Sequence, residues 1–290
     1  MLKLPSTYDQ QIEKLREHGC IITDADFCKD VLAQVSYYRL SAYFLPFKKS
    51  DGMFIPNTKF KKVFNICEFD RKLRTIIYSA IEDVEIFLRA QFSYYHGHKY
   101  GSDGYMDSSH YSSKHDHNKF IQNINEAISK NNTISFVKHH ISNYSGGFPI
   151  WVIMELFTFS MLSYFFADLL SCDQKALSRS IFNTVPKNIE SWLHCISVLR
   201  NICAHYGRLY YRILPFVPSN INQPDGSPFN TYVLNRLFGS LMALRQLYPS
   251  VGKWNNETVS SIHALIDQYI EDIELGYLGF PINWEDLLRK

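Results

Sequence analysis

The sequence predicts an all-α protein. Apolar residues recur at intervals of three and four along much of the chain, as they do on the buried face of a helix. The clearest stripe runs from residue 60 to about residue 95. Proline, glycine and capping residues separate the periodic segments. No alternation of apolar and polar residues persists long enough to indicate a strand, and no internal repeat is present.

The N-terminal part of the chain predicts a small helical segment. Helical spacing indicates one helix near the start, and Asp24 or Asp26 is placed to cap a second, short one. The unusually aromatic segment 36–47 comes next, and a loop containing glycine and proline follows it. We therefore expect two parts, an N-terminal helical segment at 1–56 and a helical domain at 57–290.

The central and C-terminal parts predict further helices. A continuous apolar stripe indicates one long amphipathic helix at 60–95. Residues 97–117, rich in Gly, Ser, Asp and His, are expected to form an irregular connection. Shorter helices are expected over residues 119–130, 136–140, 232–248 and 257–270, with a last turn at 284–288.

Three helices are predicted between residues 150 and 206. An apolar stretch after a Gly-Gly-Phe-Pro sequence indicates a helix at 150–170, and Asp173 is placed to cap the next one. Pro186 suits the first turn of a helix that runs to about Tyr206. Gly207 is its expected stop.

Composition favours a folded protein of the cytoplasm. The net charge of +2 is too small to hold nucleic acid by bulk electrostatics, so any RNA binding would need local patches. Six scattered cysteines form no Cys-x-x-Cys pair and are expected to be small buried residues. The N-terminus lacks the pattern of a signal peptide. Residues 148–170, the longest apolar stretch, include Glu155 and Asp168, which argues against a membrane span.

The strongest chemical signal is the hexapeptide 200–205, Arg-Asn-Ile-Cys-Ala-His. The guanidinium of Arg200 can bind a phosphate, the amide of Asn201 can orient it, and the imidazole of His205 can exchange protons near neutral pH. On an ideal helix Asn201 and His205 share a face, whereas Arg200 lies roughly 140° from His205. Arg200 is expected to hold a scissile phosphate, and His205 to move protons between the ribose 2′-OH and the leaving oxygen. The alternative is that both cations only offset the dipole at a helix end.

Further segments of the chain, in order, resemble the markers of the Abi-like family of bacterial abortive-infection proteins, and the Arg-Asn-x-x-x-His pattern resembles the signature of HEPN-superfamily ribonucleases. The segments are residues 37–47, 69–74, 81–89, 148–156 and 198–210. The resemblance implies a HEPN-like helical bundle, RNA cleavage in defence against phage, and catalytic roles for Arg200, Asn201 and His205. It also implies a homodimer whose two motifs form one composite site. In AbiF-like relatives it implies a noncoding RNA partner.

Basic and aromatic residues alternate directly after the motif. These residues are Arg208, Tyr210, Tyr211 and Arg212. Such a run suits a phosphate and a stacked RNA base, and the alternative is a packed loop whose arginines reach solvent. We add Arg39, from the aromatic segment, to this candidate RNA-binding set.

Glu155 is a further candidate for the catalytic site. A carboxylate in an apolar helix needs a partner, so Glu155 is expected either to orient Arg200 or His205 or to form a buried salt bridge elsewhere. Arg89 and His96 form a second Arg–His pair, which a helix-surface arginine and a loop histidine explain equally well.

The histidine pairs do not predict a metal site. They are His96 with His98, His115 with His117, and His139 with His140. No cysteine or carboxylate pattern completes a tetrahedral set, so solvated loop histidines are the better interpretation. We expect no metal and no cofactor.

The sequence thus favours a metal-independent endoribonuclease that leaves a 2′,3′-cyclic phosphate and a 5′-OH. One alternative is a non-catalytic module that binds RNA or a protein partner in a defence system. Another is a nuclease that a bound RNA or antitoxin keeps silent until infection.

Overall fold

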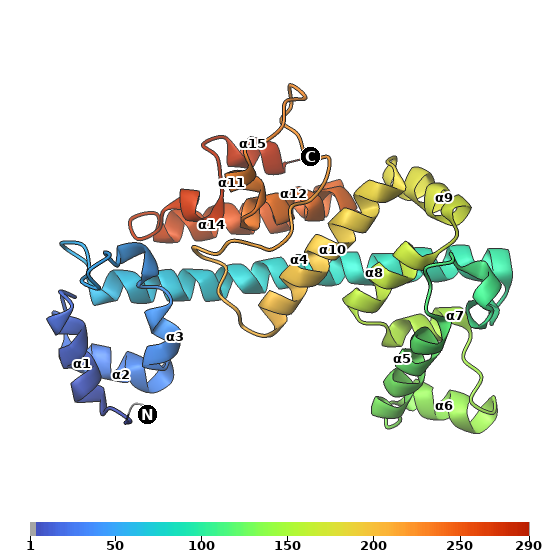
Figure 1. Ribbon diagram of the computed structural model, residues 1–290, viewed down its shortest axis with the longest axis horizontal. Helices are drawn as coiled ribbons and strands as arrows, with labels where there is room; N and C mark the ends of the chain where they lie inside the picture. Colours follow the sequence, from blue (N-terminus) through green and yellow to red (C-terminus); the bar gives the residue numbers. More distant parts are fainter. Residues whose placement is uncertain (1–3, 290) are drawn as a thin grey trace.

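The computed structural model describes residues 4–289 and consists of helices and connecting loops (Figure 1). Within those residues isolated bridge pairs occur but no strand, so the predicted all-α class is confirmed. The α-helices, in chain order, are α1 (Tyr8–Glu17), α2 (Ala25–Gln34), α3 (Tyr37–Ser41), α4 (Phe60–Tyr100), α5 (His117–Lys130), α6 (Ser135–Asn143), α7 (Ile150–Ile153), α8 (Phe159–Asp168), α9 (Ser171–Phe182), α10 (Pro186–Ala204), α11 (Thr231–Leu234), α12 (Leu237–Leu247), α13 (Val251–Lys253), α14 (Ser260–Tyr269) and α15 (Trp284–Leu288).

Helix α4 is the axis of the molecule (Figure 1). At 1.5 Å per residue it is about 60 Å long. Its buried residues follow the predicted apolar stripe. α14 packs along its N-terminal half, α10 crosses its middle, and α7 and α8 contact its C-terminal part. α8, α9 and α12 also contact α10.

The C-terminal end of α4 lies beyond its predicted position because α9 holds it. Asp173, which was expected to cap α9, is instead completely buried in that helix. It accepts hydrogen bonds from the hydroxyls of Tyr95 and Tyr100, both at 2.7 Å, and pairs with Lys99. Gly97 remains inside α4, where a Cβ would come within 3.1 Å of a side chain of α7. The predicted irregular connection therefore begins only after Tyr100.

The helix predicted over residues 150–170 is two helices, α7 and α8. Phe157 between them has an extended backbone, and its carbonyl accepts a hydrogen bond from Arg89 at 2.7 Å. Thr158 then caps α8 by accepting from the N–H of Met161 at 3.3 Å. A contact from a distant helix and a local cap together break the helix.

The two predicted C-terminal helices also differ from the expectation. Residues 232–248 form two helices, α11 and α12. The first turn of α12 packs closely against the end of α11, because a Cβ on Gly239 would lie 2.2 Å from the carbonyl oxygen of Leu234. The helix expected at 257–270 begins earlier, because α13 leads through a π-helical turn, Trp254–Val259, directly into α14.

The N-terminal helices α1 to α3 pack at one end of α4 (Figure 1). Asp24 caps α2 by accepting a hydrogen bond from the N–H of Phe27 at 2.9 Å. The ring of Phe27 meets the edges of Phe60 and Phe64 on α4. The domain boundary expected near residue 56 stays a prediction.

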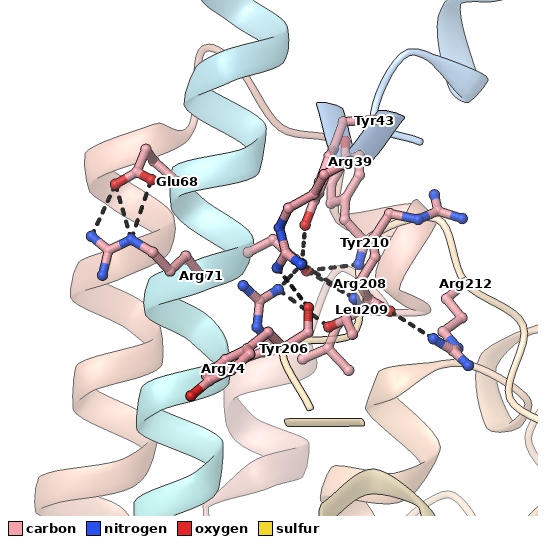
Figure 2. Close-up of polar contacts among 12 residues, drawn as sticks. Arg39, Tyr43, Glu68, Arg71, Arg74, Tyr206, Arg208, Leu209, Tyr210 and Arg212 are labelled. Carbon is pink, nitrogen blue, oxygen red and sulfur yellow. Dashed lines mark hydrogen bonds and ion pairs between the residues drawn. The ribbon is translucent and has the colours of Figure 1, made fainter. Parts of the chain in front are cut away.

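One buried carboxylate ties together three parts of the chain. Asp70 of α4 is completely buried and accepts a hydrogen bond from the hydroxyl of Tyr43 at 2.7 Å. It pairs with Arg74 and accepts from the backbone N–H groups of Leu209 and Tyr210, at 3.1 and 2.8 Å. Burial raises the pKa of the Asp70 carboxyl, and the Arg74 charge opposes that rise. Asp70 thereby joins the N-terminal segment, α4 and the chain after α10. Figure 2 labels its partners Tyr43, Arg74, Leu209 and Tyr210.

Replacing Asp70 by alanine should destabilise the fold by about 3–5 kcal/mol, because it leaves the buried Arg74 guanidinium and two backbone N–H groups unpaired. Urea unfolding measures this loss, and hydrogen exchange should show faster exchange at the N–H groups of Leu209 and Tyr210. Adding Arg74→Met should recover part of the loss. Asp51→Ala, at an exposed ion pair, should change stability by less than about 0.5 kcal/mol. Equal effects of Asp70→Ala and Asp51→Ala would contradict this role of Asp70.

His96 lies on α4, and its side chain is buried in the interior of the protein. Neither ring nitrogen has a hydrogen-bond partner among residues 4–289, and the rings of Tyr100, His110 and Phe165 surround it. Burial, with the nearby His110, lowers the pKa of His96 to about 4 from its ordinary 6.5. The folded protein therefore keeps His96 neutral at pH values where the unfolded chain binds a proton.

The free energy of unfolding should fall as the pH drops from 6.5 to 4, with His96 contributing about 3 kcal/mol of that fall. His96→Phe keeps the ring and removes the titrating group, so it should flatten this part of the stability curve. Urea unfolding at pH 7, 5.5 and 4 measures the effect, with His98→Gln, an exposed position on the same helix, as the control. An unchanged pH dependence in His96→Phe would refute the assignment.

Candidate functional site

The motif at residues 200–205 occupies the C-terminal end of α10. The helix ends at Ala204 with His205 as its cap, and the N–H of Gly207 donates to the carbonyl of Ile202 at 2.7 Å, which closes a Schellman turn. Tyr206, rather than the predicted Gly207, takes the left-handed conformation, with φ of 58°. Space at Gly207 is limited, because a Cβ there would lie 3.0 Å from the Ile202 side chain and 3.1 Å from the Ile202 carbonyl oxygen.

Arg200 faces α4. Its Nε lies 3.7 Å from a carboxylate oxygen of Glu85, and its guanidinium lies 5.7 Å from the centre of the Tyr78 ring. That Nε is buried without a hydrogen-bond partner among the described residues. Glu85 in turn accepts a hydrogen bond from Arg89 at 2.6 Å. These four side chains line a pocket of about 350 Å³ between the two helices.

His205 and Asn201 are exposed and do not line this pocket. The N–H of His205 still donates to the carbonyl of Asn201 at 3.0 Å, so no break near Cys203 turns His205 toward Arg200. Burial raises the pKa of the Cys203 thiol to about 12, which keeps it protonated and unreactive. A single chain therefore does not bring Arg200 and His205 into one pocket.

Glu155 is not the buried carboxylate that the sequence predicts. It lies on a short 3₁₀ turn, Met154–Leu156, with its side chain 57% exposed. Its oxygen is 3.6 Å from Arg89, and it lines the pocket that contains Arg200. The carboxylate that reaches Arg200 is Glu85, which sequence reasoning missed. Its spacing of four from Arg89 on a helix was the available signal.

The basic and aromatic run after the motif is only partly accessible. Tyr210 is buried, its hydroxyl accepts from the N–H of Glu274 at 2.8 Å, and it cannot stack on an RNA base. Tyr211 packs its ring edge-on against another tyrosine of the C-terminal region. Burial lowers the pKa of Arg208, and the Arg208 carbonyl accepts from Arg212 at 3.4 Å. The packed-loop interpretation therefore holds for Tyr210.

Two arginines hold the turn at the end of α10 (Figure 2). Arg39 of α3 donates to the carbonyl of Tyr206 at 2.6 Å, so this predicted residue does lie beside the motif. Arg74 of α4 donates to the carbonyl of Gly207 at 3.2 Å. Between α4 and this turn lies a second pocket of about 460 Å³, which the sequence did not reveal. Its lining residues are Arg71, Arg74, Thr75, Tyr78, Cys203, Ala204 and Tyr206.

The histidine pairs do not build a metal site. The expectation of solvated loop histidines is wrong for His96, which is buried in α4, and for His115, whose side chain is nearly buried and bonds Asp168 at 2.9 Å. Arg89, which forms the second Arg–His pair of the sequence with His96, pairs with Glu85 instead. In residues 4–289 no three His, Cys, Asp or Glu side chains gather as metal ligands would.

Among the described residues no helix is both long and apolar enough to cross a membrane.

Comparison with known proteins gives the family. No curated protein and no solved structure gives a significant match to the chain. The family model described as Abi-like protein matches residues 30–211, a span that contains α4, α10 and the whole of the 200–205 motif. The chain therefore belongs to the Abi-like protein family.

Proposed function

We propose that this protein is a metal-independent endoribonuclease of the HEPN type that acts in abortive infection. The observation that carries the proposal is the position of the 200–205 motif. It lies inside the family match and at an exposed helix end, where Arg200 lines one pocket and the two neighbours of His205, Ala204 and Tyr206, line another. Membership of the Abi-like family supports the role in phage defence.

The proposed reaction uses the RNA's own nucleophile. The ribose 2′-oxygen attacks the adjacent phosphorus while the bond to the 5′-oxygen breaks, so the products end in a 2′,3′-cyclic phosphate and a 5′-OH. His205 takes the proton from the 2′-OH or gives one to the leaving oxygen. Arg200 stabilises the charge that develops on the phosphate, and Asn201, one turn before His205, orients it.

A homodimer explains how the motif could act as one site. Arg200 lines a pocket with Glu85, whereas His205 is exposed and lies outside that pocket. If two copies face each other through the ends of their α10 helices, Arg200 of one chain can bind the phosphate while His205 of the other chain transfers the proton. Glu85 then keeps Arg200 in a defined position until a phosphate competes for it.

A non-catalytic RNA-binding module is the second candidate. The pairing of Arg200 with Glu85 favours it, because that guanidinium is already engaged by a carboxylate. Binding of a noncoding RNA is compatible with either candidate, and so is control by an antitoxin. Cleavage products decide between the two, since only the nuclease makes them.

Arg200→Ala and His205→Ala should each abolish cleavage of labelled single-stranded RNA, measured by gel with and without EDTA. Each variant removes a group that acts in the transition state, so a loss of at least about a hundredfold is expected. His194→Ala, another exposed histidine of α10, should cleave normally. Melting temperatures within about 2 °C of the parent would show that the fold is intact.

Mixing the two inactive proteins tests the composite site. If the sites are shared between chains, mixed dimers should recover part of the activity, because an intact Arg200 of one chain meets an intact His205 of its partner. Full activity of either single variant would overturn the nuclease assignment. Inactivity of the mixture at concentrations where dimers exchange subunits would overturn the composite site.

A further inference from the structure

The pocket of about 460 Å³ at the end of α10 is a second feature beside the motif. Its walls come from α4, from the last residues of α10 and from the turn that follows α10. Figure 2 shows Arg71 and Arg74 on α4 and Tyr206 in the turn. Ala204 and Tyr206 both line it, so it adjoins His205, the residue between them. Its volume lies within the usual range for sites that hold small molecules or single nucleotides.

Tyr206 is an unusual residue for its position. The left-handed backbone favours glycine or asparagine, and a tyrosine there is strained. The residue is also 70% exposed, so burial does not explain the choice of a large ring. The hydrogen bond from Arg39 fixes its carbonyl and hence the backbone that carries the ring. A strained, exposed and rigidly mounted aromatic ring is well suited to stacking on a ligand.

The pocket also offers positive charge. Arg71 is 56% exposed and pairs with Glu68 through Nε and Nη2, at distances from 2.9 to 3.2 Å. Glu68 engages Nε and Nη2 but not Nη1, so among the described residues Nη1 is the nitrogen of Arg71 that is left for a phosphate. Arg74, by contrast, is held inward by Asp70 and by the carbonyl of Gly207. Arg71 is therefore the group that can reach a phosphate.

Tyr78 connects this pocket with the one that contains Arg200. It lines both pockets, and the Arg200 guanidinium lies 5.7 Å from the centre of its ring. The Tyr206 pocket and the Arg200 pocket therefore adjoin each other at Tyr78.

We propose that the pocket lined by Tyr206, Tyr78 and Arg71 binds one unpaired nucleotide of the RNA next to the cleaved phosphate. The base stacks on the Tyr206 ring, Tyr78 forms the wall toward Arg200, and Arg71 contacts the phosphate. A base inside a duplex has both faces covered by its neighbours, so only unpaired nucleotides can enter. This inference rests on the proposed ribonuclease function and makes single-stranded RNA the substrate class.

The test measures binding apart from cleavage. In the non-cleaving His205→Ala protein, Tyr206→Ala should weaken binding of a labelled single-stranded RNA about tenfold by fluorescence anisotropy, whereas Tyr206→Phe should bind normally. Tyr206→Gly should weaken binding as much and yet raise the melting temperature by about 1–3 °C, because it relieves the backbone strain. Opposite changes in binding and stability exclude a merely structural role. Tyr164→Ala, an equally exposed tyrosine on α8, is the matched control and should bind normally.

A series of RNAs with one abasic residue at each position in turn locates the base. The effect of Tyr206→Ala should vanish when the abasic residue occupies the pocket, and only there. If the parent protein cleaves RNA but Tyr206→Ala and Tyr206→Phe bind equally well, the subsite is wrong and the nuclease stands. If the parent neither cleaves nor binds single-stranded RNA, the proposed function fails and the subsite fails with it.

Discussion

The position of the candidate site depends on the buried carboxylate of Asp70. The motif stands at the end of α10, and the chain after it must be fixed for the turn to keep its shape. Asp70 does this by accepting hydrogen bonds from the backbone of Leu209 and Tyr210 while it binds Tyr43 and Arg74. Segments that resemble separate markers of the Abi-like family in the sequence therefore meet at one point in the structure. A buried ion pair of this kind is costly to break, which makes it suited to fixing geometry.

The fixed turn explains why the motif looks incomplete in one chain. Arg200 points to α4 and is held by Glu85, while His205 caps the helix in solvent. The strained Tyr206 follows immediately and borders a pocket that reaches toward Arg200. The pocket at Arg200 also contains Glu82, Glu85 and Glu155, so carboxylates balance its two arginines. The pocket beside Tyr206 is lined by Arg71 and Arg74 and by no carboxylate, so it is the better place for a phosphate.

The sequence predicted what depends on local periodicity and caps. The all-α class, the long α4 and the start of α10 at Pro186 follow from repeated burial and from backbone preferences. The break at Phe157 and the burial of Tyr210 could not be predicted, because they depend on hydrogen bonds from or to residues more than sixty positions away. For the same reason the sequence did not identify Glu85 as the partner of Arg200. The packing of α10 against α4 determines which carboxylate of α4 lies next to Arg200.

The most direct measurement of the central claim is the chemistry of the product ends. Mass spectrometry of a short RNA treated with the purified protein in EDTA should find one fragment that ends in a 2′,3′-cyclic phosphate and one that begins with a 5′-OH. Attack by the 2′-OH leaves those ends, and the reaction proposed for Arg200 and His205 requires them. Fragments with a 3′-OH and a 5′-phosphate, or cleavage that EDTA abolishes, would contradict the account.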